Sequence, residues 1–584
     1  MFICLKIKKK QLKTKEKGLQ VCNFVFQKID TMIYPKIPLA QSIIEICLAK
    51  GITTIIISPG SRNAPLTIGF VGNPAFDCYS IADERVAAFF GMGIAQQTKK
   101  PVVLVCTSGS ALLNYYPAIA EAFYSQIPLI VISADRPQSK IDIGDGQTIR
   151  QENVFEKHSL YNANLFEEAS ADNDHKISEA IHIASTHKGP VHINAPFEEP
   201  LYETVPELSI SVNPVAFAKV TQTITIEDVA EFAALWNNSV KKMILVGVND
   251  PDSISERTIE VFAKDESVVV LTETTSNLHD PTFINNIDTI ITPFTPEDYA
   301  YFCPEILVTF GGMVVSKRIK AFLRKYKPKH HWHIDNWRAY DTFGALTKHF
   351  EVDPNTFFDL FLPLTTPVTS KYFTDLDAVK TLRKLKSDRY LAKIPFTDFK
   401  VFEKVIASLP KKSQLQISNS SAIRYAQLID IDPSIEVYCN RGTSGIDGST
   451  STAIGAAVAN SKPTVFITGD IGFLYDSNAL WNAYTPKNFK IILLNNGGGG
   501  IFRILPGHEE TPVFNTFFET SHCLTAEHLA KMYGFEYSTA SDELSLAMSL
   551  AALYAQNEKP CILEVFTPTF ENDRILLQYF KELI

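Results

Sequence analysis

The sequence lacks the features of a membrane-spanning, secreted or thiolate-metal protein. Its nine cysteines include no Cys-x-x-Cys pair, so they indicate neither a zinc site nor a disulfide framework, and we expect reduced thiols. No apolar run approaches the ~18 residues of a membrane span, and Met1–Lys10 has no signal-peptide core or cleavage site. Charged residues are 20 % and hydrophobic residues 45 % of the chain, which is ordinary globular usage. These features predict a cytoplasmic globular protein with no membrane span.

Negative charge exceeds positive charge in the chain outside the first 31 residues. The formal net charge is −9, although residues 1–31 hold eight lysines against Glu16 and Asp30. The rest of the chain is therefore strongly acidic and offers no general surface for nucleic acid, although local cationic pockets for acidic metabolites are compatible with it. Because Met32 is followed by Tyr34-Pro35 and an amphipathic pattern, we interpret residues 1–31 as a disordered or mis-assigned extension that carries no chemistry.

Apolar, β-branched runs recur along the chain, each followed by a Gly-, Ser- or Asn-rich turn and a helical pattern. Such βαβ units build parallel sheets, and 584 residues exceed the ~250–300 of a single core. We therefore expect an α/β protein of three doubly wound parallel-sheet domains, divided near residues 205 and 370. The predicted strands are Ile52–Ser58, Val102–Cys106, Leu129–Ser133 and Gly189–Ile193, then Met243–Val246, Val268–Leu271 and Glu305–Phe310, then Gln414–Ser418, Glu436–Cys439, Thr464–Thr468, Lys490–Leu494 and Cys561–Phe566.

Two polar turns follow successive apolar runs of the third block. Gly469-Asp470 comes after one run, and Asn496, 26 residues beyond the aspartate, opens the sequence Asn-Gly-Gly-Gly-Gly after the next. A carboxylate and a carboxamide at strand ends supply hard oxygen ligands, and glycines let the backbone approach a metal-bound phosphate. With no nearby Cys or His, this set favours Mg²⁺ with a diphosphate over zinc. Either turn alone is equally compatible with a plain surface turn, but the pair matches the Gly-Asp and Asn-Asn signature of thiamin-diphosphate proteins.

Other nucleotide-binding patterns are incomplete. Gly91-Met92-Gly93 and Gly144-Asp145-Gly146 each open a Gly-x-Gly-x-x-Gly pattern, but Gln96 and Ile149 occupy the position of the third glycine. No Gly-Lys-Ser/Thr sequence occurs anywhere in the chain. Neither a nicotinamide site nor a P-loop is therefore indicated.

The first block carries the motifs that make a family resemblance specific. Ser58–Pro65 reads Ser-Pro-Gly-Ser-Arg-Asn-Ala-Pro at a strand end, and Asp83-Glu84-Arg85 precedes a predicted helix. With Asn440–Gly448, these motifs are similar to those of the 2-succinyl-5-enolpyruvyl-6-hydroxy-3-cyclohexene-1-carboxylate synthase family, the menaquinone-pathway members of the thiamin-diphosphate enzymes. The resemblance implies three domains with boundaries at 32–205 for the pyrimidine-binding domain, 206–370 for the central domain and 371–584 for the diphosphate-binding domain.

The resemblance also implies how the cofactor, thiamin diphosphate, is held. Glu84 would hydrogen-bond the aminopyrimidine ring, and Ile446 would support the cofactor from beneath. Asp470, Asn496 and the Gly498 carbonyl would hold Mg²⁺, with Mn²⁺ as an alternative ion. The other expected cofactor contacts are Gly469, Ile501 and Phe502. Taken alone, Glu84 is equally compatible with a surface residue at a helix start, and Ile446 with a core residue.

The implied reaction decarboxylates 2-oxoglutarate and adds the resulting succinyl-semialdehyde carbanion to isochorismate. Both substrates are dicarboxylates, so the site needs several cations, preferably arginines that bind carboxylates bidentately. The expected substrate-binding residues are Ser61, Arg62, Arg136, Lys317, Arg318, Ser420, Arg424 and Arg441. Gln147 is expected near the reactive carbon of the cofactor. Two departures from the family pattern, Gly146 in place of asparagine and the long run Gly497–Gly500, each remove one polar side chain.

In similar enzymes the two halves of the cofactor are bound by different subunits. We therefore expect a homodimer or homotetramer with active sites at the subunit interface, in which Glu84 faces the partner's Asp470. Two other functions share part of the pattern. Another thiamin-diphosphate enzyme, such as an acetolactate-synthase-like carboligase or a 2-oxoacid decarboxylase, would lack the Ser58–Pro65 and Asn440–Gly448 motifs. A non-catalytic cofactor-binding or scaffolding protein would have no need of Glu84.

Overall fold

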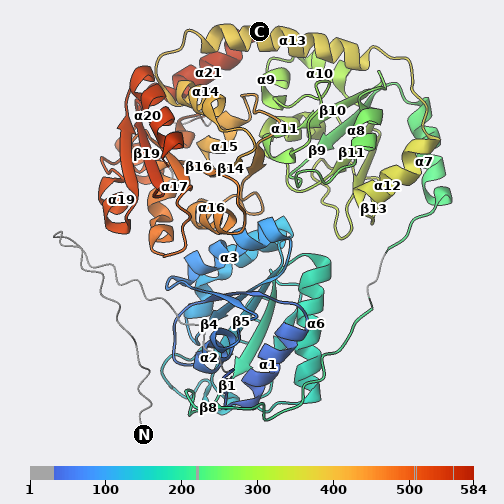
Figure 1. Ribbon diagram of the computed structural model, residues 1–584. Coiled ribbons are helices and arrows are strands. Elements are labelled where there is room, and N and C mark those ends of the chain that lie inside the picture. The colour runs from blue at the N-terminus through green and yellow to red at the C-terminus, as the bar shows by residue number, and fades with distance from the viewer. Residues whose placement is uncertain (1–31, 219–221, 505–506, 508, 557) are drawn as a thin grey trace.

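Three parallel sheets follow one another along the chain, each covered by helices (Figure 1). The computed structural model describes residues 32–218, 222–504, 507, 509–556 and 558–584. The α/β class with three parallel sheets is confirmed, and the interpretation of residues 1–31 lies outside the described residues. Each sheet lies within one of the three expected residue ranges, while the domain boundaries themselves stay predictions. No helix in the described ranges is long and apolar enough to cross a membrane.

The first sheet has six parallel strands in the order β3-β2-β4-β5-β7-β6. The chain adds β3 on one side of β2 and then returns to place β4 on the other, so the turns after β2 and β4 meet at a switch in strand order, where α/β sheets bind ligands. Its elements are α1 (Pro38–Ala49), β2 (Thr54–Ile57), α2 (Ala64–Gly72), β3 (Asp77–Ser80), α3 (Glu84–Thr98), β4 (Val102–Cys106), α4 (Ala111–Asn114), α5 (Tyr116–Ser125), β5 (Leu129–Asp135), η1 (Gln138–Lys140), β6 (Asn162–Asn164), α6 (Ala171–His187) and β7 (Val191–Pro196), with β1 (Tyr34–Pro35) and β8 (Thr204–Val205) as a separate antiparallel pair.

The third sheet repeats this topology in the order β15-β14-β16-β17-β19-β18. Its switch in strand order lies between β14 and β16, so the turns after β14, β16 and β17 share one edge. Its elements are α13 (Tyr372–Leu391), α14 (Asp398–Ser408), β14 (Gln414–Ile417), α15 (Ser421–Ala426), β15 (Glu436–Tyr438), α16 (Ser449–Val458), β16 (Thr464–Gly469), α17 (Asp470–Tyr475), η4 (Ser477–Leu480), β17 (Lys490–Asn495), η5 (Gly500–Ile504), α18 (Pro512–Phe514), η6 (Asn515–Glu519), α19 (Glu527–Tyr533), β18 (Glu536–Ala540), α20 (Glu543–Ala555), β19 (Cys561–Phe566) and α21 (Asn572–Glu582).

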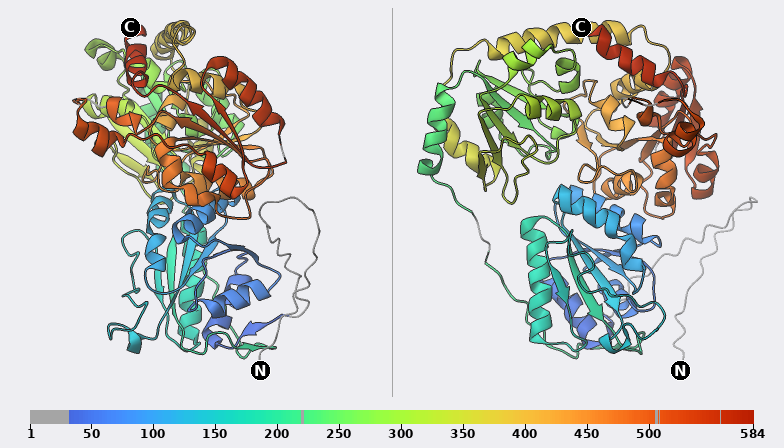
Figure 2. Two further views of the ribbon diagram at one scale, coloured as in Figure 1. Left: turned by 90° about the vertical axis from the view of Figure 1, so that its left-hand side faces the viewer. Right: turned by 180° about the vertical axis from the view of Figure 1, so that it is seen from behind.

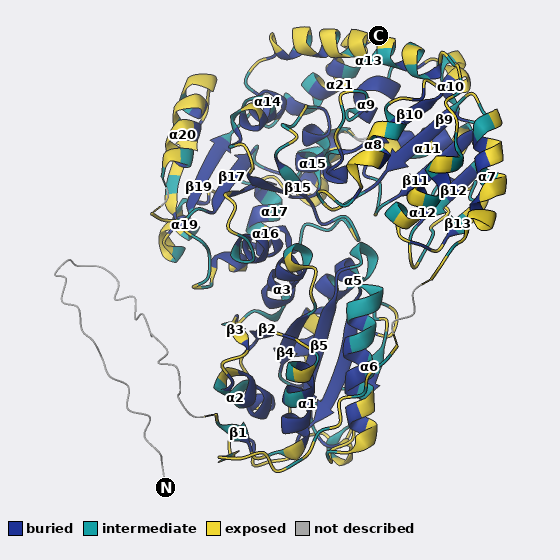
Figure 3. Cartoon of the chain, turned by 45° about the vertical axis from the view of Figure 1, so that its right-hand side comes forward, coloured by how far each residue is buried: buried dark blue, intermediate teal, exposed yellow. Residues whose placement is uncertain are grey.

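The central sheet has five parallel strands in the order β10-β9-β11-β12-β13. The inner strands of this sheet and of the other two sheets are buried on both faces (Figure 3), which explains their continuous apolar sequences. Its elements are α7 (Ile226–Asn238), β9 (Lys242–Val246), α8 (Glu256–Phe262), β10 (Val268–Thr272), η2 (Thr274–Ser276), α9 (Ile287–Ile291), α10 (Pro296–Phe302), β11 (Ile306–Phe310), α11 (Lys317–Lys325), β12 (His330–Ile334), β13 (Lys348–Phe350), α12 (Pro354–Phe361) and η3 (Leu362–Leu364).

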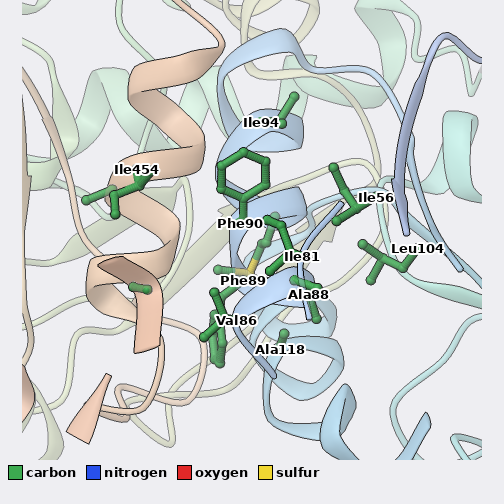
Figure 4. Close-up of a cluster of buried hydrophobic side chains, with 14 of the residues drawn as sticks. Ile56, Ile81, Val86, Ala88, Phe89, Phe90, Ile94, Leu104, Ala118 and Ile454 are labelled. Carbon is green, nitrogen blue, oxygen red and sulfur yellow. The ribbon is translucent and has the colours of Figure 1, made fainter. Parts of the chain in front are cut away.

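The first and third domains meet through α3 and α16, the helices that follow the equivalent strands β3 and β15. Glycines allow a close backbone approach, since a Cβ at Gly455 would lie 2.0 Å from the Phe90 carbonyl oxygen and one at Gly93 would lie 2.1 Å from the Thr452 carbonyl oxygen. Ile454 of α16 belongs to the same buried cluster as residues of α3, β2 and β4 (Figure 4). The two cofactor-binding halves expected from the sequence therefore share one hydrophobic core.

The central domain contacts the third domain at several places. The long helix α13 contacts α9 and β10 on one side and α21 on the other, and it crosses both domains in Figure 1. The Asn277 carboxamide donates to the Val437 carbonyl oxygen and accepts from the Val437 N–H, at 2.9 and 2.8 Å. The described parts of the link back to the first domain, residues 206–218 and 222–225, run along the outside of the molecule (Figure 2). The central domain thus flanks the carboxyl edge of the third sheet.

Candidate active site

Asp470 and the glycine run after Asn496 lie together at the carboxyl edge of the third sheet. They meet because β16 and β17 are neighbouring parallel strands and each turn directly follows its strand. The Asp470 carboxylate accepts hydrogen bonds from the Gly497 and Gly498 N–H groups at 2.9 and 3.0 Å. It is 4 % exposed, and burial raises its pKa. A carboxylate held by backbone donors beside a glycine loop is suited to a cation with a bound phosphate.

The donor chemistry at this edge fits a hard divalent cation. Asp470 offers a carboxylate, Asn496 a carboxamide and the glycine loop backbone carbonyls, which are the oxygen ligands that Mg²⁺ prefers. Among the described residues no cluster of three His, Cys, Asp or Glu side chains could hold a softer metal. The one basic group that pairs with Asp470 in this part of the chain is His522, whose Nε2 lies 3.4 Å from Oδ2. A buried carboxylate with so little positive charge beside it would be stabilised by a bound cation.

A buried ion pair supports the glycine loop from behind. The Arg503 guanidinium donates to both carboxylate oxygens of Glu519, with 2.7 Å from Nη2 to Oε2, and both residues are nearly inaccessible to solvent. The Glu519 carbonyl in turn accepts from the Gly499 N–H at 2.6 Å. Ile501 and Phe502 lie on η5 directly after the loop, and Phe502 is partly exposed with its ring near that of Phe518. The apolar wall expected at these two positions therefore borders the loop.

Glu84 is the first residue of α3 and lies at the junction with the third domain. Asp83 caps the helix by accepting from the Val86 N–H, and the Asn478 side chain donates to Asp83 at 2.9 Å. The Arg85 guanidinium donates to the Tyr475 carbonyl at 3.0 Å and lies over the Tyr475 ring. Partial burial raises the pKa of Glu84 above its ordinary value. A carboxyl group that keeps its proton more readily is suited to hydrogen bonding with a ring nitrogen.

The loop that carries Ile446 faces the same junction. Gly448 lies so close to α3 that a Cβ there would be 2.1 Å from the Phe89 ring, and Ile446 approaches Gly472 of α17. Glu84 and Ile446 are thus brought to one region by α3, α16 and α17 of a single chain. That Glu84 faces Asp470 of a partner chain stays a prediction.

A buried carboxylate that the sequence interpretation missed holds this loop. Glu121 of α5 is 1 % exposed and accepts from the Gly442 N–H, the Thr443 N–H and the Thr443 hydroxyl at 2.6, 2.6 and 2.8 Å. Ser125 donates to the same carboxylate at 2.8 Å. The contact joins residues about 320 positions apart, so no local motif could have indicated it. Glu121 therefore positions the segment that contains Arg441 and Ile446.

Several of the expected substrate-binding cations gather between the central and third domains. Burial and the neighbouring Arg441 charge lower the pKa of Arg424, which shows that the two guanidinium groups are close. Arg441 donates to Asn419 at 2.7 Å, while its buried Nε has no hydrogen-bond partner among the residues that the structure describes. Lys320 also lies in the field of Arg441 and Lys317, and its pKa is lowered by burial and by these charges. A concentration of half-buried cations of this kind is suited to carboxylate ligands.

The start of α11 is positioned by acidic side chains beneath it. The Glu273 carboxylate accepts from the Val315 and Ser316 N–H groups at 2.6 and 2.7 Å, and burial raises its pKa to about 7. Lys317 and Arg318 follow as exposed residues, and the Arg318 guanidinium lies 4.5 Å from the centre of the Phe580 ring. Lys320 was not expected from the sequence, although its spacing of three from Lys317 places both on one face of a helix. Ser420, with φ +69°, begins α15 opposite this region.

The expected site residues of the first domain are arranged differently. Arg62 is buried and already paired, because it donates to the Phe197 carbonyl at 2.9 Å and to Glu199 at 3.1 Å. Arg136 donates to the Gly146 carbonyl at 3.0 Å and so supports the exposed loop that carries Gln147. Ser61 is exposed. Within the described ranges, no hydrogen bond or ion pair joins these side chains to Arg424 or Arg441.

The comparison with known proteins first defines the class. Residues 37–159 match the thiamine pyrophosphate enzyme N-terminal TPP binding domain, and residues 420–565 match the corresponding C-terminal TPP binding domain. These segments contain Glu84 and Ile446 together with both turns at the carboxyl edge of the third sheet. The chain is therefore an enzyme that depends on thiamine pyrophosphate, the cofactor also called thiamin diphosphate.

Full-length relatives then define the family. A 2-succinyl-5-enolpyruvyl-6-hydroxy-3-cyclohexene-1-carboxylate synthase of Flavobacterium johnsoniae is 72 % identical over 94 % of this chain and 100 % of its own length. The synthases of Flavobacterium psychrophilum and Porphyromonas gingivalis are 67 % and 37 % identical, over 94 % and 91 % of this chain and 100 % and 94 % of their own. The chain belongs to this synthase family, as the resemblance of its motifs predicted.

The Glu121 contact gives a testable prediction about cofactor binding. In Glu121→Gln an amide replaces one of the two oxygens that accept from the loop, so a donor would face the Gly442 or Thr443 N–H. Because hydrogen bonds to a charged group contribute about 1.5–3 kcal/mol, we expect roughly tenfold weaker affinity for thiamin diphosphate. Calorimetric titration in saturating Mg²⁺ measures it. Ser125→Ala, which removes only the bond from within α5, serves as the control, and equal affinity of both variants would refute the role of Glu121.

Proposed function

We propose that this chain decarboxylates 2-oxoglutarate on thiamin diphosphate and adds the succinyl-semialdehyde carbanion to isochorismate, as a step of menaquinone biosynthesis. The product is the 2-succinyl-5-enolpyruvyl-6-hydroxy-3-cyclohexene-1-carboxylate for which the family is named. The observation that carries this proposal is the 72 % identity to the Flavobacterium johnsoniae synthase over that protein's whole length. The hydrogen bonds from the Gly497 and Gly498 N–H groups to Asp470 support it independently, because a carboxylate beside a glycine loop is suited to a cation with a bound diphosphate.

The cofactor would be held from both cofactor-binding domains. Asp470, Asn496 and the Gly498 carbonyl would ligate Mg²⁺ or Mn²⁺, and this cation would bind the diphosphate. Glu84 would hydrogen-bond the aminopyrimidine ring, with Ile446 beneath the cofactor. The remaining lining residues would be Gly469, Ile501 and Phe502. When bound, thiamin diphosphate supplies the carbon nucleophile and the electron sink for decarboxylation.

Glu84 would act through the proton on its carboxyl group. Partial burial at the start of α3 raises its pKa, so the protonated form is more populated near neutral pH than for an exposed glutamate. Such a carboxyl would share its proton with a ring nitrogen and thereby favour the imino form of the ring, in which the exocyclic nitrogen can accept a proton. The capping of α3 by Asp83 and the contact of Arg85 with Tyr475 hold this carboxyl in place.

The carboxylates of the substrates would be bound by the cations between the central and third domains. Arg424, Arg441 and the start of α11 converge from two domains, and the unpartnered Nε of Arg441 is a free donor within the third domain. The other substrate-binding residues would be Ser61, Arg62, Arg136, Lys317, Arg318 and Ser420, with Gln147 beside the reacting carbon. Arg62 would have to exchange its contact with the largely exposed Glu199 for a substrate carboxylate. A carboxylate ligand is chemically equivalent to the one it would displace.

The active form would be a cytoplasmic homodimer or homotetramer. Tyr475 and Trp481 support this assembly, because both are more than half exposed beside the start of α3, where water would otherwise cover large apolar side chains. We expect light scattering on a size-exclusion column to give at least twice the chain mass of 65.2 kDa. A fully active species of the single-chain mass would refute the assembly.

The reaction itself gives a direct prediction. Purified protein with thiamin diphosphate, Mg²⁺ and 2-oxoglutarate should consume isochorismate, which is followed by the loss of its ultraviolet absorbance. Pyruvate in place of 2-oxoglutarate should give no loss, because it lacks the distal carboxylate that the arginines would bind. Consumption with pyruvate would instead favour an acetolactate-synthase-like carboligase.

The role of Glu84 is tested by Glu84→Gln. The amide cannot share a proton with the ring nitrogen, so the exchange of the cofactor C2 proton for deuterium should slow by about 10²–10⁴-fold. Nuclear magnetic resonance of the bound cofactor measures this rate. Asp83→Asn, which keeps a helix-capping oxygen, serves as the matched control. An unchanged exchange rate with cofactor bound would remove Glu84 from the mechanism and favour a non-catalytic binding protein.

A further inference from the structure

Asp398 is a buried carboxylate whose position is not explained by the roles assigned above. It is the first residue of α14, is 4 % exposed, and within the described ranges forms no ion pair with a lysine, arginine or histidine. Burial of a carboxylate without a cation costs free energy, so its retention needs a compensating interaction. Its two oxygens accept from Asn496 Nδ2 at 2.9 Å and from the Thr567 hydroxyl at 2.6 Å.

The bond to Asn496 determines which way that carboxamide faces. An ionised carboxylate only accepts hydrogen bonds, so it selects the amide NH₂ and repels the amide oxygen. The Asn496 main chain is fixed separately, because its carbonyl accepts from the Thr569 hydroxyl at 2.7 Å. With the backbone and the NH₂ both fixed, the Asn496 oxygen is turned away from Asp398. In a free asparagine the two orientations of the amide would be nearly equivalent.

Asp398 also adds negative charge behind Asn496, at the carboxyl edge of the third sheet. Asp398 is bonded to Asn496, which follows β17, and Asp470 follows the neighbouring strand β16, so the two carboxylates lie at the same edge of the sheet. A divalent cation near Asp470 would be stabilised by the negative charge of both carboxylates. Side chains that orient metal ligands and add charge behind them commonly change metal affinity by 10–100-fold.

We propose that Asp398 is a positioning residue of the metal site, which turns the Asn496 oxygen toward the cation by binding its NH₂ group. The inference rests on the proposed role of Asn496 as a metal ligand. The competing explanation is local, since an acidic residue in the first turn of α14 also stabilises the helix through its dipole. That explanation predicts an effect on folding stability and none on metal affinity.

The test measures metal affinity directly, with Mg²⁺ titrated at fixed thiamin diphosphate and cofactor binding followed by calorimetry. Asp398→Ala should raise the Mg²⁺ concentration for half-maximal binding by about tenfold or more. Thr567→Val removes the other hydrogen bond to the same carboxylate but leaves the Asn496 bond, so it should change this concentration by less than about twofold. Equal concentrations for Asp398→Ala and the unsubstituted protein, or equal increases in both variants, would overturn the proposal.

An exchange of the two side chains keeps the proposal testable where Asp398→Ala fails to fold. Asn496→Asp places two carboxylates face to face and should weaken Mg²⁺ binding. Adding Asp398→Asn restores one donor and one acceptor at the original net charge, so the double variant should bind Mg²⁺ at least tenfold more tightly than Asn496→Asp alone. No recovery would overturn the proposal. Failure of the unsubstituted protein to bind the cofactor in a Mg²⁺-dependent way would instead overturn the metal assignment on which it rests.

Discussion

The close packing of α3 on α16 is the constraint on which the rest of the structure depends. The first and third domains have the same strand topology, and α3 and α16 follow equivalent strands in it. The contact therefore joins topologically equivalent helices of the two domains. Gly93 and Gly455 make it possible, because a side chain at either position would clash with the backbone of the opposing helix. Because Glu84 begins α3 and Gly448 immediately precedes α16, this contact places the Glu84 carboxyl and the Ile446 loop at one junction.

Buried carboxylates organise the loops around this junction. Glu121 binds the 442–443 backbone, Glu273 binds the start of α11, and Asp398 binds Asn496. Each carboxylate is nearly inaccessible to solvent and accepts hydrogen bonds from backbone or amide groups. Because a buried carboxylate without these bonds would cost free energy, the bonds fix the position of the loop that donates them. Loops that carry a site have little hydrophobic core of their own, so such polar anchors supply the rigidity that catalysis requires.

The sequence predicted the parts of the fold and site that local pattern determines. The runs for β4, β16 and β17 were recognisable because their strands are buried on both faces, and the proximity of Asp470 to the glycine loop followed from adjacent parallel strand ends. The edge strand β3 has exposed ends and the sequence Asp-Cys-Tyr-Ser, and it escaped prediction because it has no apolar run.

Long-range contacts were beyond sequence reasoning for a different physical reason. Glu121 and Asp398 act on residues 321 and 98 positions away, and neither belongs to a motif that names its partner. The pairing of Arg62 with Glu199 depends equally on the turn of chain after β7. A single sequence shows which charged residues are present but not which of them form ion pairs in the fold. Arginine motifs alone therefore overstate the number of cations that are available to bind a substrate.

The central domain contributes to the site through its contact with the third domain. Arg424 and Arg441 come from the third domain and the start of α11 from the central domain, so the cation cluster exists only when the two are joined. The join is specific, because Asn277 pairs with both backbone groups of Val437 on β15, the strand that directly precedes the loop carrying Arg441. Like charges brought together in this way raise the free energy of the empty site. A dicarboxylate substrate would relieve that repulsion, so part of its affinity would come from charges that the folded protein has already assembled.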